Sequence, residues 1–170
     1  MPAFGNTSKN NLEESHPLLQ ELFNEVIKTF DCSIIQGFRN EEEQNQAYQD
    51  KKTTLQFPDS KHNETPSLAV DVCPYPIDWA NRDRFHYFAG FVKGVAARLG
   101  ISVRWGGDWD NDTETKDNNF DDLPHFELVS TEKVNGFNQV EFLSNRLKVV
   151  ESELSRANSK LSAIKVVIVE

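Results

Sequence analysis

The chain has 170 residues, of which 38% are hydrophobic, and a formal net charge of -9 at pH 7. This length allows one domain with a real hydrophobic core and an appendage. An acidic chain repels the phosphates of nucleic acids and anionic lipid surfaces, so we expect no nucleic-acid partner.

The N-terminal stretch MPAFGNTSKNNLEESHP has neither the basic segment nor the apolar segment of a signal peptide. Nowhere does an apolar run approach the roughly 20 residues that a membrane span needs. We therefore expect no signal peptide and no membrane span. Cys32 and Cys73 lack the C-x-x-C spacing of zinc ribbons and redox motifs, so we expect both to be reduced and buried.

Residues 16–30 carry apolar side chains at helical spacing, which predicts a core-facing helix with Ser15 as its N-cap. The stretch CSIIQGF that follows is typical of a short buried strand. Asn40 and Glu43 then form the pattern of a capping box, which starts a shorter helix. Arg39 consequently lies at a strand-to-helix junction.

The stretch LAVDV alternates and predicts a strand on which Asp71 and Cys73 share one face. We expect Cys73 to be a small wall residue there rather than a metal ligand. A long helix is predicted over about residues 82–99, because Asn81 is a suitable N-cap and Gly100 stops the helix.

The stretch ISVRW predicts another strand, and residues 106–122 are too rich in Gly, Asp and Asn for regular structure. Long exposed loops of this kind often carry function. The alternating acidic residues of the loop resemble the start of a calcium site. The glycine of an EF-hand turn is missing, however, which favours a solvated acidic loop. In PHFELV, which alternates again, His125 and Glu127 share one strand face.

From residue 140 the periodicity changes to heptads, which continue to residue 168. Four consecutive heptads predict a coiled coil, and the strict a/d spacing favours association with another copy over packing back on the same domain. We therefore predict a first domain over residues 1–133, a C-terminal amphipathic helix over 134–170, and a homo-oligomer formed through 140–168. The order and direction of this oligomer stay open.

Three residues of metal-ligating type can meet if two of the predicted strands pair. A catalytic zinc site takes three protein ligands, commonly His and a carboxylate, and leaves a fourth position for water. His62 lies in a loop before the strand that carries Asp71, and His125 heads a later strand. If these strands are antiparallel neighbours, Asp71 and His125 converge while His62 folds over from its loop.

Two charged residues are candidates for the chemistry itself. Asp122 stands three residues before His125, across a turn stiffened by Pro124, where a general base that takes a proton from the attacking water belongs. Arg39 offers a positive fork for an oxyanion or a substrate carboxylate. The alternative for Arg39 is a surface ion pair with the glutamates at 41–43.

Further residues are candidates for substrate binding. Ser60 lies two residues before His62 and can donate a hydrogen bond to the same substrate group. Trp109, like Trp105, is expected either to wall the cleft or to anchor the loop in the core.

The motifs around these residues resemble a known enzyme family. QGFRNEEEQNQAY, SKH followed by AVDVCP, RWGGDWD and DLPHFEL occur in order over roughly residues 4–129. Together they resemble the D-alanyl-D-alanine carboxypeptidase and L-alanyl-D-glutamate endopeptidase family of zinc peptidases. The nearest branch is the phage endolysins that cut peptidoglycan peptides. One departure is NETPSL after His62, which makes the gap to Asp71 two residues longer than usual and should bulge at Thr65 and Pro66.

The resemblance implies an α+β fold of the hedgehog/D-Ala-D-Ala peptidase type: a small, mainly antiparallel sheet, helices packed on one side and a zinc cleft on the other. It implies that His62, Asp71 and His125 are the ligands of one zinc ion. It also implies that Asp122 is the base and that Arg39 binds substrate and stabilises charge.

The expected function is that of an L-alanyl-D-glutamate endopeptidase, an endolysin that accumulates in the bacterial host cytoplasm and acts on peptidoglycan stem peptides of the cell wall. A D-Ala-D-Ala carboxypeptidase or dipeptidase is the runner-up, and residue types do not separate the two. A non-catalytic, zinc-stabilised wall-binding or oligomerisation module is the alternative from another class. Asp122 argues against it, because a structural zinc site needs no base.

Overall fold

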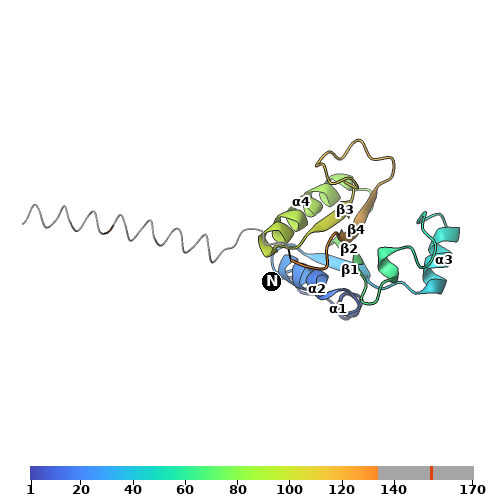
Figure 1. Ribbon diagram of the computed structural model, residues 1–170. Helices are drawn as coiled ribbons and strands as arrows, with labels where there is room; N and C mark the ends of the chain where they lie inside the picture. The colour runs from blue at the N-terminus through green and yellow to red at the C-terminus, as the bar shows by residue number, and fades with distance from the viewer. Residues whose placement is uncertain (134–153, 155–170) are drawn as a thin grey trace, which may run out of the picture. The chain divides into compact units, whose positions relative to one another are not determined.

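A four-stranded antiparallel sheet in the order β1-β2-β4-β3 forms the centre of the computed structural model, which describes residues 1–133 and Leu154 (Figure 1). The small antiparallel sheet expected from the sequence is therefore confirmed. Adjacent pairing of the second and fourth strands places Asp71 directly opposite His125. The strands are β1 (Cys32–Gln36), β2 (Ala69–Pro74), β3 (Val103–Gly106) and β4 (Asp122–Leu128).

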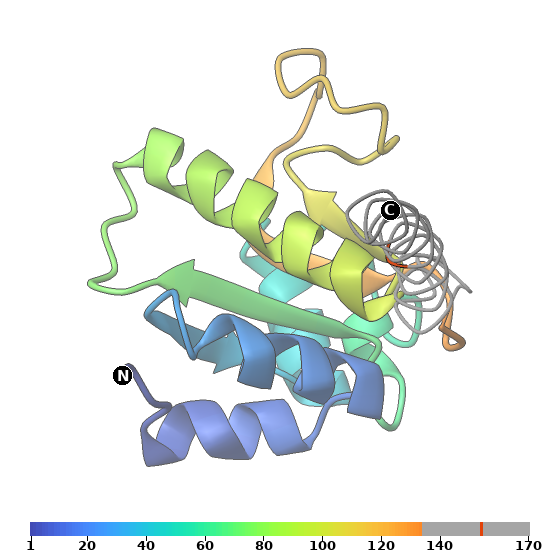
Figure 2. The ribbon, with the colours of Figure 1, turned by 90° about the vertical axis from the view of Figure 1, so that its left-hand side faces the viewer.

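The helices are divided between the two faces of the sheet. Helices α2 (Pro17–Val26) and α4 (Arg82–Leu99) cover one face, and α3 (Glu41–Gln49) lies behind the other (Figure 2). The prediction of helices packed on one side of the sheet therefore holds for α2 and α4, whereas α3 lies on the side predicted for the cleft. The reason lies in the composition of α3, whose one buried side chain is the polar Gln44, so that it has no apolar stripe to place on a sheet.

Aromatic side chains join the helical layer to the sheet. Phe23 of α2 and Phe88 of α4 are fully buried, and each ring packs edge-on against Phe126 of β4, with centroid distances of 5.6 and 6.0 Å. Burying a side chain of this size contributes about 1.5–3 kcal/mol. The core therefore lies on the helical face of the sheet, and the opposite face is left for the cleft.

The helix boundaries follow capping chemistry. In α4, Asn81 accepts a hydrogen bond from the Arg84 amide at 3.1 Å, and Gly100 ends the helix in the left-handed region at φ 70°, both as predicted. The N-cap predicted for α2 is wrong. His16 takes this place, because its Nδ1 accepts from the Leu18 amide.

Helix α1 (Asn6–Glu13) was not predicted, since only Ser8 and Leu12 of its residues are buried and it shows no clear apolar stripe. Its polar side chains bind the edge of the sheet. Ser8 Oγ accepts from the Ile34 amide and Asn11 Nδ2 donates to the Ile34 carbonyl, each at 3.1 Å. α1 thus provides hydrogen-bond partners for the backbone of the edge strand β1, which could otherwise pair with another chain.

The remaining predictions concern membrane spans, the two cysteines and the C-terminal segment. Among the helices that the structure describes, none has the length and apolar character to cross a membrane. Cys32 and Cys73 are buried free thiols, as expected. Apart from Leu154, the predicted heptads at 140–168 and the predicted domain 134–170 lie outside the described residues.

Candidate active site

The three predicted metal ligands meet on the face of the sheet opposite α2 and α4. His62 comes from the short helix η1 (Lys61–Asn63), Asp71 from β2 and His125 from β4. His62 Nε2 lies 3.2 Å from His125 Nδ1, and Asp71 Oδ1 lies 3.3 and 3.2 Å from these two nitrogens. All three side chains are buried or nearly so.

The spacing of these donor atoms fits a single metal ion. Bonds from nitrogen and oxygen ligands to a tetrahedral metal are about 2.0–2.1 Å long, which separates two ligand atoms by about 3.3 Å. The two nitrogens and Asp71 Oδ1 form a nearly equilateral triangle of this size. A tetrahedral metal ion bound by this donor set, two imidazoles and one carboxylate, would keep a fourth position for water.

Hydrogen bonds on the outer side of each imidazole determine which nitrogen faces the centre. His62 Nδ1 donates to the Gly37 carbonyl at 2.7 Å, and His125 Nε2 donates to Glu127 Oε2 at 3.0 Å. In a neutral imidazole the other nitrogen then carries a lone pair. His62 Nε2 and His125 Nδ1 are therefore presented as metal ligands, with the outer partners that ligating histidines normally have.

The electrostatics of the cluster also favour a cation. Burial alone would raise the pKa of Asp71, but the charge of His62 and a hydrogen bond from His125 hold it well below its usual range. Burial alone would lower the pKa of His125, but hydrogen bonds to Asp71 and Glu127 raise it to about 9. The metal-free cluster therefore attracts a proton, which a metal ion displaces when it binds.

An irregularity in β4 brings Asp122 to the same side as His125. Residues three apart in a regular strand point to opposite faces. Trp105 pairs with Phe126, however, whereas the next residue, Gly106, pairs with Asp122. The extra residues of β4 form a bulge that turns both polar side chains to the cleft. The predicted turn before His125 is thus wrong, because Asp122 already begins the strand.

The cluster lies at the bottom of a cleft of about 1070 Å³. Residues of α3 and of the segment 50–61 line it, and so do residues of the loop 107–121. Figure 1 shows that the ribbons of α3 and of this loop lie apart from each other. Among the residues that line this cleft are the predicted site residues Arg39, Ser60, Trp109 and Asp122. The cleft thus brings together every residue that the sequence singled out for the chemistry.

Arg39 contacts the candidate metal ligand Asp71 rather than the glutamates at 41–43. Its Nη2 donates to Asp71 Oδ2 at 3.3 Å and its Nη1 donates to Gln44 Oε1 at 3.2 Å. Gln44, fully buried, in turn donates to the Leu55 carbonyl at 2.6 Å. The guanidinium is therefore fixed beside the cluster with its charge directed into the cleft.

Ser60 has a local partner as well as a place in the cleft. It is the N-cap of η1, where its Oγ accepts a hydrogen bond from the His62 amide at 3.3 Å. Asn63 closes this capping box, because its side chain accepts from the Ser60 amide. The hydroxyl thus helps to orient the segment that carries a metal ligand.

The two tryptophans, for which the sequence left wall and anchor roles open, take one role each. Trp105 is buried in the core, and its Nε1 donates to the Leu123 carbonyl at 2.7 Å. Trp109 lines the cleft, with its ring centroid 5.5 Å from that of His125. Trp109 is therefore the aromatic wall beside the metal ligands.

The loop 107–121 is only partly the solvated acidic loop expected from the sequence. Asp108 is 2% exposed, and its Oδ2 accepts a hydrogen bond from Lys93 of α4 at 2.7 Å. Burial alone would raise the pKa of Asp108, but this hydrogen bond and the charge of Lys93 lower it. Asp110 and Asp112 are exposed, with carboxylates within 4.8 Å of that of Asp108. The pair between Asp108 and Lys93 attaches the loop to α4.

Sequence reasoning missed the residue that holds His125. Glu127 was placed on the same strand face as His125 but was given no role, although alternation along a strand puts such a pair within contact distance. Glu127 is a buried residue, and its carboxylate also accepts hydrogen bonds from Arg104 of β3. A charged residue two positions after a candidate ligand was the available signal.

Three donors that could hold a metal ion, a neighbouring carboxylate and an open cleft are the features of a single-metal hydrolase site. Residues 2–129 match the family described as phage L-alanyl-D-glutamate peptidase. The chain belongs to this family. Membership makes it a peptidase, which confirms the resemblance and the prediction of an enzyme over a non-catalytic module.

Two relatives illustrate how far the similarity extends. The L-alanyl-D-glutamate peptidase of Escherichia phage T5 is 30% identical over 135 residues, which cover 74% of this chain and 97% of that protein. The crystal structure of the L-Ala D-Glu endopeptidase ChiX of Serratia marcescens superposes with a TM-score of 0.59 at 26% identity. That similarity covers 75% of this chain and 90% of the other.

Proposed function

We propose that the chain is a zinc peptidase that hydrolyses the L-alanyl-D-glutamate bond of peptidoglycan stem peptides in the bacterial cell wall. Membership in the phage L-alanyl-D-glutamate peptidase family supports this substrate, as do the names of its relatives. The observation that carries the proposal is the triangle of donor atoms from His62, Asp71 and His125 at the bottom of a cleft that Asp122 also lines.

Zinc suits this donor set, because nitrogen and carboxylate ligands at tetrahedral spacing are typical of catalytic zinc sites. His62, Asp71 and His125 would hold the ion. When bound there, zinc polarises a carbonyl and acidifies a water molecule. The remaining steps depend on side chains of the chain itself.

Asp122 acts as the general base. It is not one of the three donors, and it lines the cleft beside them. Burial and the negative charge of Asp71 raise the pKa of Asp122 above its usual value, which makes the ionised carboxylate a better proton acceptor. It takes the proton of the attacking water and delivers it to the nitrogen of the leaving D-glutamate.

Arg39 and Trp109 hold the substrate on either side of the reacting bond. The fixed guanidinium of Arg39 stabilises the oxyanion that develops on the scissile carbonyl, or binds a carboxylate of the substrate. Trp109 offers an apolar surface next to His125. The Ser60 hydroxyl lines the same cleft and can donate to the peptide.

The substitution Asp122→Asn tests the role of the base. Asparagine keeps the shape of the side chain but cannot accept the proton, so hydrolysis should slow at least about a hundredfold while the zinc affinity stays unchanged. Rates would be measured on a muramyl peptide with zinc in excess, and zinc affinity by competition with a chromophoric chelator.

Asp121→Asn is the matched control, because Asp121 is the adjacent carboxylate and pairs with Arg82. It should hydrolyse the peptide at nearly the rate of the unchanged chain. An Asp122→Asn variant with an undiminished rate would remove Asp122 from the mechanism. A loss of rate shared equally by both variants would point to the local backbone rather than to a base.

The bond that is cut is tested by digesting purified sacculi and identifying the new amino terminus. Free amine on D-glutamate is expected. A new terminus on D-alanine, or release of free D-alanine, would instead identify a carboxypeptidase or dipeptidase.

A further inference from the structure

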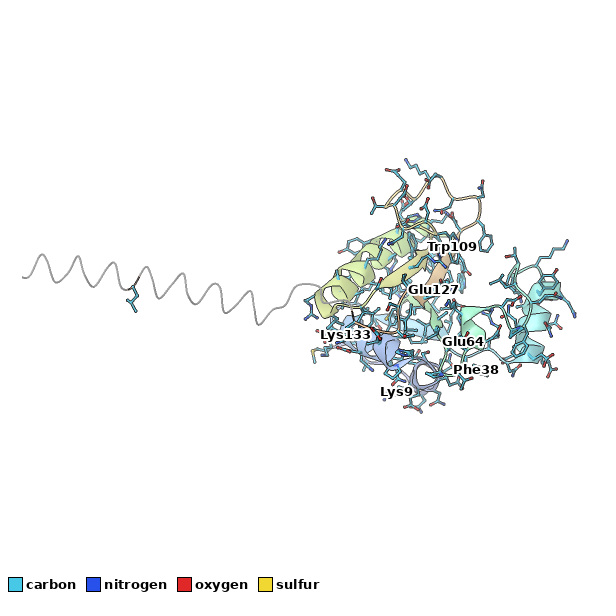
Figure 3. The ribbon with its side chains drawn as sticks, viewed as in Figure 1. Lys9, Phe38, Glu64, Trp109, Glu127 and Lys133 are labelled. Carbon is cyan, nitrogen blue, oxygen red and sulfur yellow. The ribbon has the colours of Figure 1, made fainter. Side chains whose placement is uncertain are left out.

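Four side chains form a closed ring at the bottom of the cleft, and Figure 3 labels two of them, Trp109 and Glu127. His125 Nε2 donates to Glu127 Oε2 at 3.0 Å, and Arg104 Nε donates to Glu127 Oε1 at 3.0 Å. Arg104 then reaches the loop, where Nη1 donates to the Trp109 carbonyl at 3.3 Å. The Trp109 ring lies 5.5 Å from the His125 ring and completes the circle.

Strand pairing builds this arrangement. Arg104 of β3 and Glu127 of β4 are direct partners across the antiparallel pair. Val103 and Trp105, on either side of Arg104, are buried in the core, so alternation directs Arg104 to the cleft face. The positions of both side chains are therefore determined by the register of the sheet and not by a loop.

Glu127 uses its two oxygens for different partners. Oε2 accepts from the imidazole of His125, and Oε1 accepts from both Nε and Nη2 of Arg104. The side chain of Glu127 is 8% exposed, so without Arg104 it would be a buried charge with one neutral donor. Arg104 thus determines where the carboxylate lies, and the carboxylate determines how His125 is turned.

The guanidinium also fixes the aromatic wall. Its centre lies 5.5 Å from the centroid of the Trp109 ring, within the range of a cation–π contact, in addition to the hydrogen bond to the Trp109 carbonyl. A planar fork can make these contacts at once, whereas the single ammonium of a lysine cannot. One residue therefore contacts the support of a metal ligand and the wall of the substrate cleft.

We propose that Arg104 is a positioning residue that couples metal binding to substrate binding: through Glu127 it orients His125, and through Trp109 it shapes the cleft. The inference rests on the proposed metal site and deepens it. Arg104 itself touches neither the metal nor the reacting atoms.

Arg104→Met tests the connection to the metal. It keeps an apolar stem but leaves Glu127 without its cation, so the zinc affinity should fall about tenfold or more, as for outer partners of other metal-bound histidines. Chelator competition measures this affinity without any hydrolysis. Nitrogen-detected NMR of the zinc-bound protein should show the His125 ring in a mixture of orientations or tautomers.

Arg98→Met is the matched control, because Arg98 is an exposed arginine of α4 that pairs with Glu25. It should bind zinc as the unchanged chain does. An Arg104→Met variant with the zinc affinity of the control would overturn the proposal. Reduced zinc affinity in a chain that cleaves no peptidoglycan would retain this inference and reject the proposed function.

Arg104→Lys separates the two halves of the coupling. Lysine can still neutralise Glu127 but loses the contacts with Trp109, so the zinc affinity should stay within about threefold while KM for the peptide rises about fivefold or more. An unchanged KM would overturn the claim that Arg104 shapes the substrate cleft through Trp109. If Arg104→Met does not fold, Glu127→Gln tests the claim that metal binding depends on Glu127, through which Arg104 acts on His125. A zinc affinity equal to that of the unchanged chain would overturn this claim.

Discussion

At the scale of single residues, the two histidines are oriented by different means. His62 is held by a backbone carbonyl, that of Gly37, and His125 by a side chain, that of Glu127. A Cβ atom at position 37 would lie 1.9 Å from the Asn11 carbonyl oxygen, so only glycine fits there. The orientation of His62 thus depends on chain packing, whereas that of His125 depends on a charge.

Ser60 has two possible roles, because it caps η1 and also lines the cleft. Because its hydroxyl caps η1, Ser60→Ala should lower the free energy of unfolding of the metal-free protein by about 1 kcal/mol and weaken zinc binding through His62. Urea unfolding with and without chelator measures the first effect, and chelator competition the second. A raised KM with unchanged stability and zinc affinity would instead assign Ser60 to the substrate.

Residue types and strand alternation singled out His62, Asp71 and His125 as candidate ligands, on the condition that two strands pair. The structure has that pairing and brings the three side chains together. Asp122 was selected because a turn was predicted before His125. The structure has a bulged strand there instead, which the sequence pattern does not reveal. Glu127 was missed because its role is to orient His125, and this hydrogen bond is evident only in the tertiary structure.

At the scale of elements, the bulge between β3 and β4 brings Asp122 to the candidate site, whose metal-ligating residues are assembled by the pairing of β2 with β4. The bulge requires the backbones to approach closely at Gly106, where a Cβ atom would lie 2.3 Å from the Asp122 carbonyl oxygen. A side chain at this position would push the start of β4 outward. The register of Asp122 therefore depends on a glycine in the neighbouring strand.

Gly106→Ala should consequently displace Asp122. We expect a loss of stability of about 1–3 kcal/mol from overpacking, and a fall in activity of about tenfold to a hundredfold from the misplaced base. Urea unfolding and peptide hydrolysis measure the two effects.

Gly94→Ala serves as the control, because Gly94 is exposed within α4 and a Cβ atom there meets nothing within 4 Å. It should stabilise the protein by about 0.5–1 kcal/mol and leave activity unchanged. If Gly106→Ala behaved like Gly94→Ala, the close approach at the bulge would not constrain the site.

At the scale of the whole molecule, the core and the site occupy opposite faces of one sheet. The candidate metal ligands Asp71 and His125 are on strands whose other faces pack against the helices. The apolar core can therefore form without a metal ion, and the metal should add to the stability rather than create the fold.

Removal of the metal tests this separation. A chelator should abolish hydrolysis and lower Tm while circular dichroism shows retained secondary structure, since zinc at a hundred times its Kd adds only about 2.7 kcal/mol. Readdition of zinc should restore both activity and Tm. Hydrolysis that survives complete metal removal would contradict the mechanism, and unfolding on chelation would contradict an independent core.

The heptads over 140–168 stay a prediction. Sedimentation of the full chain beside a chain that ends at residue 133 should show a larger assembly for the full chain, because a/d apolar positions associate between copies. Equal monomeric masses would rule out the coiled coil.

The sequence by itself determined the helix α4 with both its caps, the alternation of the strands, and the residue types of a candidate metal site with a candidate base beside it. These depend on local spacing and on chemistry that each residue carries. Only the tertiary structure decided that α3 walls the cleft, that β4 is bulged, and that Arg104 and Glu127 support His125. Such features arise from contacts between residues distant in the chain, which no local pattern specifies.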